Sequence, residues 1–239
     1  MMLRAMEPFG LAIKAYWEGN KSAKVTFHRD DGLIHDYHVG HCFRKPEDFS
    51  DLEKQALEMC FGKVLDLGAG VGPHSLQLQE KGLELYAMDI SKEACEIMEK
   101  RGVINVLFSD VYGIQKENFD TILLMGRAIG FVEDLTGITK FFNHCENILS
   151  SKGMILLDSL DVRVTSEPDH LAYHERSKTL GRYIGVVGLQ MEYNGQFGEP
   201  FKLLHIDPDT LHSIAEDLDW KCEILRKEES GDYLAKISK

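Results

Sequence analysis

The stretch KVLDLGAGVGPHS, residues 63–75, joins a short apolar run to three glycines at alternate positions and then to residues that suit a helix. Glycine permits a tight turn and allows a ligand to approach the main chain where a side chain would collide. Backbone amides at the start of the following helix would face that ligand. A G-x-G-x-G run alone is a weak signal, because many such runs are only flexible turns.

Outward from this stretch, short apolar runs alternate with segments of helical spacing. Strands are expected at 63–67, 84–89, 105–108, 119–125 and 153–159, and helices are expected at 50–60, 74–81, 92–101 and 134–149. Alternation at this spacing predicts a parallel sheet covered by helices on both faces, with right-handed crossovers.

The two flanking regions have a different character. A short helix at 9–17 and a hairpin of strands 24–29 and 33–39 predict an N-terminal cap over residues 1–49. The main domain is expected to span 50–239, with an insertion at 160–206 that begins with a turn-rich segment. Within it, strands 184–193 and 197–206 meet at Asn194-Gly195, a strong hairpin signal. A helix begins at Asp207-Pro208, and strands 220–226 and 233–237 end the chain as an antiparallel pair.

Composition limits the class of protein. The 239 residues, 44% of them hydrophobic, suit one large domain or one domain with a modest accessory piece. The formal charge of −12 disfavours nucleic-acid and anionic membrane partners. No run reaches the roughly 18 apolar residues of a membrane helix, and the N-terminus lacks a secretory signal pattern. The five scattered cysteines, Cys42, Cys60, Cys95, Cys145 and Cys222, indicate reduced thiols in a cytoplasmic protein.

Three acids stand at the ends of successive strands. Asp66 lies just before the glycines, Asp89 ends the strand LELYAMD, and Asp110 follows VLFS. In open parallel sheets, ligands bind outside the carboxyl ends of the strands, so the three acids are expected to surround one crevice. There the carboxylate of Asp89 suits two ribose hydroxyls, and that of Asp110 suits an exocyclic amine.

A nicotinamide dinucleotide is the main competitor for this crevice. Its G-x-G-x-x-G fingerprint would require a third glycine at position 73, where this chain has Pro73, whereas the glycine stands one residue earlier, at Gly72. The carboxylate of Asp66 would repel a pyrophosphate and attract an ammonium group. The residues therefore favour a ligand that carries an amine and a sulfonium.

At this point four segments, VLDLGAGVG, AMDIS, FSDVYG and FDTILLM, resemble the successive motifs of class I S-adenosylmethionine-dependent methyltransferases. The resemblance runs from about residue 50 to the C-terminus. It implies an α/β fold with a doubly wound, Rossmann-like, mostly parallel sheet of seven strands, the last of them antiparallel, here with an N-terminal cap and an inserted hairpin. The segments FRKPEDFSDLEKQAL and LMGRAIGF are similar to a bacterial group of methyltransferases of undefined substrate.

The resemblance also implies S-adenosylmethionine as cofactor and a set of cofactor-binding residues at the strand ends. The set is Asp66, Gly68, Ala69, Gly70, Gly72, Asp89, Ile90, Asp110, Val111, Met125 and Gly126. The glycine loop would line the methionine portion through its backbone, and Asp66 would face the amine, often through water. Asp89 would hold the ribose, Ile90 would pack on adenine, and Asp110 would accept from the adenine amino group. The last two members of the set would close the site beside the transferable methyl group.

Methyl transfer from a sulfonium leaves the protein to align the reactants and to exclude water, so a dedicated base is needed only when the acceptor arrives protonated. Catalytic residues are therefore not assigned. The expected acceptor is a small-molecule metabolite, since the Asn-Pro-Pro-Tyr type of motif found in many nucleic-acid amino methyltransferases is missing. The alternatives are a non-catalytic S-adenosylmethionine-binding regulatory module and an NAD(P)-dependent oxidoreductase. The oligomeric state stays open.

Several polar residues keep two interpretations. Arg44 either reaches the carboxylate of the cofactor or anchors the cap, and His74 is equally ambiguous. Arg127 binds an anionic acceptor or forms an ion pair, while Asp158 and Asp161 orient a substrate or cap a loop.

The histidines predict no metal site. His28, His35, His38 and His41 crowd the N-terminal region, and His170 and His174 share one potential helix face. The latter pair resembles half a metal site, but no third ligand completes it. A role as general base for His38, His41 or His174 is a hypothesis that a pH–rate profile would test.

Overall fold

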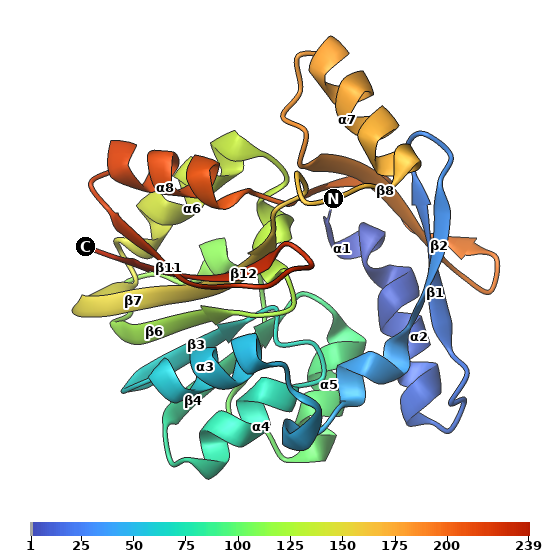
Figure 1. Ribbon diagram of the computed structural model, residues 1–239. Helices are drawn as coiled ribbons and strands as arrows, with labels where there is room; N and C mark the ends of the chain where they lie inside the picture. Colours follow the sequence, from blue (N-terminus) through green and yellow to red (C-terminus); the bar gives the residue numbers. More distant parts are fainter. Residues whose placement is uncertain (1) are drawn as a thin grey trace.

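The structure, a computed structural model that describes residues 2–239, contains two β-sheets with helices on and between them (Figure 1). The α-helices are α1 Met2–Ala5, α2 Glu7–Trp17, α3 Asp51–Met59, α4 Pro73–Glu80, α5 Lys92–Arg101, α6 Leu135–Cys145, α7 Pro168–Thr179 and α8 Pro208–Asp217. The short 3-10 helices are η1 Val39–Phe43, η2 Pro46–Asp48, η3 Val111–Gly113 and η4 Ala128–Val132. The strands are β1 Lys24–Arg29, β2 Ile34–His38, β3 Lys63–Leu67, β4 Glu84–Asp89, β5 Val106–Phe108, β6 Phe119–Leu124, β7 Leu149–Leu160, β8 Val186–Tyr193, β9 Gln196–Phe197, β10 Phe201–Leu204, β11 Lys221–Lys227 and β12 Asp232–Ser238.

The larger sheet has seven strands in the order β11-β12-β7-β6-β3-β4-β5. Strand β3 pairs in parallel with both β4 and β6, and the strand order reverses about it. The last strand, β12, lies between β7 and β11 and is antiparallel to both. The predicted fold class, a doubly wound and mostly parallel sheet with an antiparallel last strand, is confirmed.

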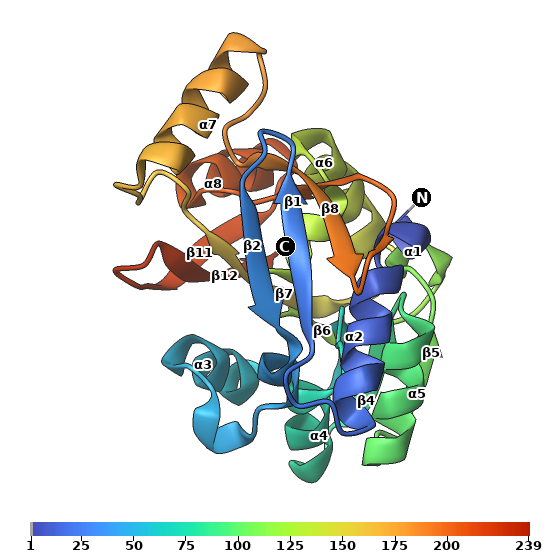
Figure 2. The same ribbon diagram turned by 90° about the vertical axis from the view of Figure 1, so that its right-hand side faces the viewer.

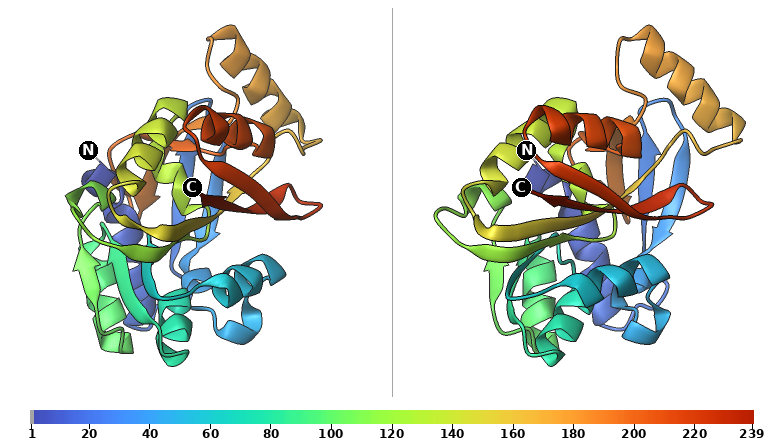
Figure 3. Two further views of the ribbon diagram at one scale, coloured as in Figure 1. Left: turned by 90° about the vertical axis from the view of Figure 1, so that its left-hand side faces the viewer. Right: turned by 60° about the vertical axis from the view of Figure 1, so that its left-hand side comes forward.

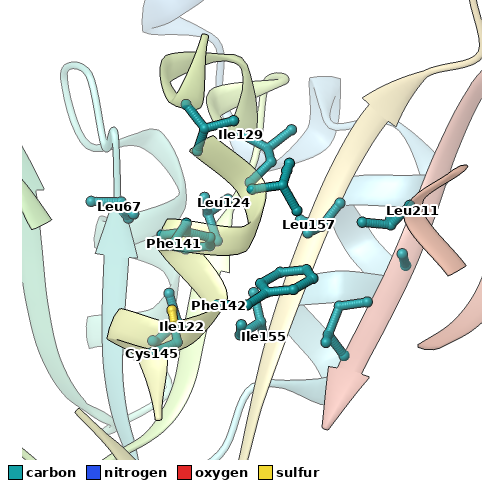
Figure 4. Close-up of a cluster of buried hydrophobic side chains, with 14 of the residues drawn as sticks. Leu67, Ile122, Leu124, Ile129, Phe141, Phe142, Cys145, Ile155, Leu157 and Leu211 are labelled. Carbon is teal, nitrogen blue, oxygen red and sulfur yellow. The ribbon is translucent and has the colours of Figure 1, made fainter. Parts of the chain in front are cut away.

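Helices cover both faces of this sheet (Figures 1 and 3). On one face, α3, α4 and α5 pack over a cluster that includes Leu57, Leu78 and Met98. On the other face, α6 and α8 pack over a larger cluster, part of which Figure 4 shows around Phe141 and Phe142. Burial on both faces explains why the central strands read as continuous apolar runs in the sequence.

A second sheet has the order β10-β8-β1-β2, and β9 pairs with the far end of β8. All its pairings are antiparallel, and Phe27 of β1 lies opposite Met191 of β8. The N-terminal region and the insertion, far apart in sequence, therefore form one sheet, which stands beside the larger one (Figure 2). Helix α2 packs between the two sheets, where its residues Ala12 and Ile13 share a buried cluster with Val25, Met191 and Ile97 of α5.

Both expected hairpin turns are present. Asn194 and Gly195 have φ values of 50° and 78°, as the two central residues of a type I′ turn require, and Gly32 has a φ of 96°. Most expected boundaries shift by one or two residues, and the larger differences are at β7 and in the insertion. Strand β7 begins at Leu149, because Leu149 pairs with Phe119 of β6. Helix α6 therefore ends at Cys145, before residue 149 where it was expected to end. The second insertion strand is divided into β9 and β10 around Pro200, which has no amide to donate to a strand pairing.

Helix α7 forms within the turn-rich segment. Pro168 occupies its first turn, and Tyr173, His174 and Ser177 are its buried residues. Figure 3 shows that α7 projects from the rest of the molecule beside the second sheet. Within residues 2–239, no helix has the length and apolar character needed to cross a membrane.

Candidate functional site

The glycine loop between β3 and α4 adopts a backbone conformation that only glycine tolerates well. Gly68, Gly70 and Gly72 have φ values of 75°, 59° and 75°. A Cβ atom on Gly72 would stand 3.0 Å from the side chain of Val103, whereas a Cβ on Gly70 would meet no atom within 4 Å. Gly72 is thus required by close packing under the loop, and Gly70 faces open space where a ligand can approach the backbone.

Asp89, the last residue of β4, connects the glycine loop to the start of α5. Its Oδ2 accepts a hydrogen bond from the Gly70 amide at 2.9 Å, and its Oδ1 accepts one from the Ser91 amide at 2.8 Å. Burial raises the pKa of Asp89 to about 6, although both amides act in the opposite direction. Each carboxylate oxygen can accept a second hydrogen bond. The residue as a whole is only partly covered.

Asp66 lies beneath the glycine loop, with only 1% of its surface exposed. Its Oδ2 accepts a hydrogen bond of 2.5 Å from the hydroxyl of Ser75 in α4. Burial raises the pKa of this carboxyl group, while the nearby His74 lowers it. The structure therefore places Asp66 under the loop and in contact with α4.

The remaining members of the predicted set lie at the ends of the neighbouring strands. Asp110 is exposed, and its Oδ1 accepts a hydrogen bond from the Gly113 amide at 3.0 Å, so it caps η3. The next residue, Val111, is buried, as is Met125 at the end of β6, and Ile90 is partly covered. Gly126 has a φ of 72° and, like Gly70, would have nothing within 4 Å of an added Cβ.

The cap reaches this edge of the larger sheet through η1. Phe43 of η1 lies under the guanidinium of Arg101, whose carbon is 5.7 Å from the ring centroid, and the same guanidinium donates to the Val71 carbonyl in the glycine loop. Burial raises the pKa of Cys42 in η1, and the negative charge of Asp89 adds to that effect. The cap therefore lies against the glycine loop.

A buried group of side chains that the sequence analysis missed holds the cap in place. Glu53 of α3 accepts hydrogen bonds from His74 Nε2 at 2.7 Å, from the Ser50 amide at 2.8 Å and from the guanidinium of Arg44. Burial alone would raise the pKa of Glu53, but these donors together lower it to about 2. The Arg44 guanidinium also donates to the His41 carbonyl at 2.9 Å, which favours the anchoring interpretation for this arginine.

A signal for this group was present in the sequence. Residues 50–53 read S-D-L-E, the pattern of a capping box, and Ser50 does accept from the Glu53 amide at 3.2 Å. The pattern identifies Glu53 as a helix-capping residue. The pattern does not reveal that Oε1 of Glu53 accepts hydrogen bonds from His74 and Arg44. That pairing depends on how α3, α4 and the cap pack together.

Arg127, which follows β6, forms the ion pair that was one of its two interpretations. Its Nε and Nη2 atoms lie 2.9 and 2.6 Å from Oδ1 of Asp232, and its backbone amide donates to Asp158 Oδ1 at 2.8 Å. Strand β7 extends to Leu160, so Asp158 lies within the strand and does not follow it as expected from the sequence. Both oxygens of Asp161 bind the guanidinium of Arg163 at 2.7 Å.

The histidines are distributed over several elements. His28 pairs with Glu192 at 2.8 Å, His35 stacks on Phe27 with ring centroids 5.1 Å apart, and His174 is buried on α7. The three candidates for a general base, residues 38, 41 and 174, lie on β2, η1 and α7. In the part of the chain that the structure describes, no group of three or more potential ligands could hold a metal ion.

Comparisons with known proteins agree with this fold. The family described as methyltransferase domain matches residues 64–153. A solved structure of an S-adenosylmethionine-dependent methyltransferase from Bacteroides fragilis, in complex with S-adenosyl-L-homocysteine, is 30% identical, covers 98% of this chain and 95% of its own, and superimposes with a TM-score of 0.85. The CcbJ methyltransferase from Streptomyces caelestis has the same fold at 11% identity, with a TM-score of 0.62 over 82% of this chain and 91% of its own.

A curated relative, the YqeM protein of Bacillus subtilis (strain 168), whose description as a methyltransferase is provisional, is 24% identical over 104 residues. That match spans 41% of this chain and 42% of the length of YqeM. The chain belongs to the family of class I S-adenosylmethionine-dependent methyltransferases.

Proposed function

We propose that this protein is an enzyme that transfers a methyl group from S-adenosylmethionine to a small-molecule acceptor. The observation that carries the proposal is the contact between Asp89 and the Gly70 amide, which brings two of the family motifs together at one edge of the sheet. The Bacteroides fragilis relative, similar over nearly its whole length, is in complex with S-adenosyl-L-homocysteine. We place the enzyme in the cytoplasm because all five cysteines are free and four are buried.

The residues at this edge fit the cofactor. Gly70 and Gly126 both leave open space where a side chain would otherwise stand, as a ligand that lies against the backbone requires. Asp89 keeps acceptor positions for two ribose hydroxyls, and Asp66 puts negative charge under the loop where an ammonium group would bind. Asp110 is exposed at the place proposed for adenine, with one oxygen used in capping η3.

When bound, S-adenosylmethionine supplies a methyl group on a positively charged sulfur, and the sulfur is the leaving group. The residues of this chain bind the cofactor, orient the acceptor in line with the methyl group and exclude water. The cap contributes to that exclusion through η1, which is tied to the glycine loop by Arg101. Asp89 and the glycine loop bind the cofactor, and they take no part in bond making.

Calorimetry on the full chain tests the cofactor assignment. We expect S-adenosylhomocysteine to bind and NADH to show no heat of binding, because the loop lacks the third glycine at position 73 and Asp66 opposes a pyrophosphate. Binding of NADH without binding of S-adenosylhomocysteine would overturn the proposal. Incubation with S-adenosylmethionine and a metabolite extract then separates an enzyme, which forms S-adenosylhomocysteine, from a non-catalytic binding module, which does not.

Replacing Gly70 with alanine is expected to weaken S-adenosylhomocysteine binding at least about tenfold. The added methyl group would occupy the open space beside the loop, and the φ of 59° would become strained by about 1–2 kcal/mol. Gly82→Ala is the matched control, since Gly82 has a φ of 78°, is equally open and lies at the far end of α4. Urea unfolding should show similar destabilisation of both variants, with affinity lost only in Gly70→Ala. Equal affinities of Gly70→Ala and the unmodified chain for S-adenosylhomocysteine would contradict the placement of the ligand beside Gly70.

A further inference from the structure

Asp158 is a buried carboxylate with an incomplete set of hydrogen bonds. It lies near the carboxyl end of β7 with 9% of its surface exposed. Its Oδ1 accepts from the Arg127 amide at 2.8 Å, and no other donor among residues 2–239 reaches either oxygen. Buried carboxylates are normally paired with a cation or saturated by donors, because burial of an unpaired charge is costly. Within the described part of the chain, Oδ2 of Asp158 has no donor and is not fully enclosed, so it can accept a hydrogen bond from a ligand.

The charged groups around Asp158 are already engaged with one another. The guanidinium of Arg127 binds Asp232, and His74 binds Glu53. Burial raises the pKa of Asp158 to about 6, and the charge of Asp232 adds to this, while the amide and charge of Arg127 and the charge of His74 act in the opposite direction. At neutral pH Asp158 is thus ionised, without a cation in contact, and poised to accept a proton.

Asp158 lies close to the residues expected beside the transferable methyl group. Its contact with the Arg127 amide places the carboxylate one residue from Gly126, which the family resemblance places beside the transferable methyl group. Four acids, Asp66, Asp89, Asp110 and Asp158, lie at or near the carboxyl ends of their strands, so this edge of the sheet is lined by acidic side chains. An anionic acceptor would be repelled there, because the neighbouring arginine is already neutralised by an ion pair.

We propose that Asp158 binds the ammonium group of an amine acceptor and removes its proton, which makes this protein an amine N-methyltransferase. This inference rests on the proposed function. Asp158 takes one proton from the ammonium nitrogen, whose freed lone pair forms a bond to the methyl carbon. The carbon–sulfur bond breaks with its electron pair remaining on sulfur, so the methylated amine leaves as a cation. Asp158 then releases its proton to water.

The test compares two ligands that differ at the reacting centre. S-adenosylhomocysteine has a neutral sulfur, whereas sinefungin has an amine-bearing carbon there, so its ammonium group reports the charge that faces the methyl position. By calorimetry at pH 8, the full chain should bind sinefungin about tenfold more tightly than S-adenosylhomocysteine. Asp158→Asn, which keeps an oxygen for the Arg127 amide, should bring this ratio close to one without changing the affinity for S-adenosylhomocysteine.

Asp120→Asn is the control, since Asp120 lies at the opposite end of the sheet, where its carboxylate accepts from the Lys63 amide and Ser150. The ratio of the affinities for sinefungin and S-adenosylhomocysteine should be the same in Asp120→Asn as in the unmodified chain. In the unmodified chain this affinity ratio should decline as the pH falls through about 6, because Asp158 becomes protonated. In Asp158→Asn the affinity ratio should not change over this range. A preference for sinefungin that survives in Asp158→Asn would overturn the inference alone, whereas failure to bind S-adenosylhomocysteine would overturn the proposed function with it.

The chemical class of the product provides a second readout. After incubation with methyl-labelled S-adenosylmethionine and a metabolite extract, the remaining S-adenosylmethionine, which is itself a cation, is first separated by chromatography. The transferred label should then be retained on a cation exchanger at neutral pH, because a methylated amine stays protonated. Label that passes through in neutral or anionic products would rule out an amine acceptor while leaving the methyltransferase assignment intact.

Discussion

Replacement of Asp89 by alanine is expected to lower the affinity for S-adenosylhomocysteine about a hundredfold. The carboxylate is placed to accept two ribose hydroxyls, and each charge-assisted hydrogen bond contributes about 1.5–3 kcal/mol. It also holds the Gly70 amide and the Ser91 amide, so the variant loses the bonds that position the glycine loop against α5. Isothermal calorimetry of the two proteins at pH 8 measures the change.

Asp217→Ala serves as the control for Asp89, because Asp217 is exposed at the end of α8. The affinity of Asp217→Ala for S-adenosylhomocysteine should match that of the unmodified chain. The affinity of the unmodified chain should also fall below about pH 6, where protonation of Asp89 removes an acceptor, and the Asp89→Ala variant should lack this dependence. An unchanged dissociation constant in Asp89→Ala would show that the ribose binds elsewhere.

Replacement of Glu53 by alanine is expected to lower the free energy of unfolding by about 3–5 kcal/mol, the usual cost of removing one partner from a buried ion pair. Glu53 is 7% exposed, and the variant leaves both Arg44 and His74 without their shared acceptor. The capping interaction with Ser50 is lost as well. Urea unfolding gives the change, and Glu58→Ala, on the exposed side of the same helix, is the matched control with an expected effect below about 0.5 kcal/mol.

The contribution of Glu53 has a defined pH dependence. Its pKa is lowered in the folded state to about 2 from an ordinary value of 4.5. The stabilisation is therefore fully present above about pH 4.5 and is lost as the pH falls towards 2, since the unfolded chain takes up the proton first. The difference in stability between the unmodified chain and Glu53→Ala should shrink over this range, and a difference that stays constant would contradict the assigned pairing.

Most of the larger sheet was predictable from local pattern. The run at 63–67, the glycines that follow it and the helix at 92–101 agree with the structure to the residue, because strand and helix periodicity and glycine at positive φ are properties of a few adjacent residues. Boundaries failed where distant pairing competes with local preference. Residue 149 lies at the end of an expected helix, yet it joins β7 because Phe119 provides a strand partner.

The assembly of the second sheet could not be read from local pattern. Each of its two hairpins is marked by its own turn residues, but neither carries a signal that β1 pairs with β8. Antiparallel pairing between strands distant in sequence depends on complementary apolar faces. Here the paired strands share the face on which α2 packs, where Ala12 and Ile13 contact Val25 and Met191.

The sequence by itself determined the fold of the larger sheet and the carboxylate at the end of β4, since each follows from the order of residues along one strand and turn. Only the tertiary structure decided the partners of the polar side chains. It paired Arg44 and His74 with Glu53, directed Arg127 to Asp232, and left Asp158 with a single amide donor. The physical reason is that hydrogen bonds between side chains join atoms far apart in the chain, so their partners depend on the packing of whole elements against one another.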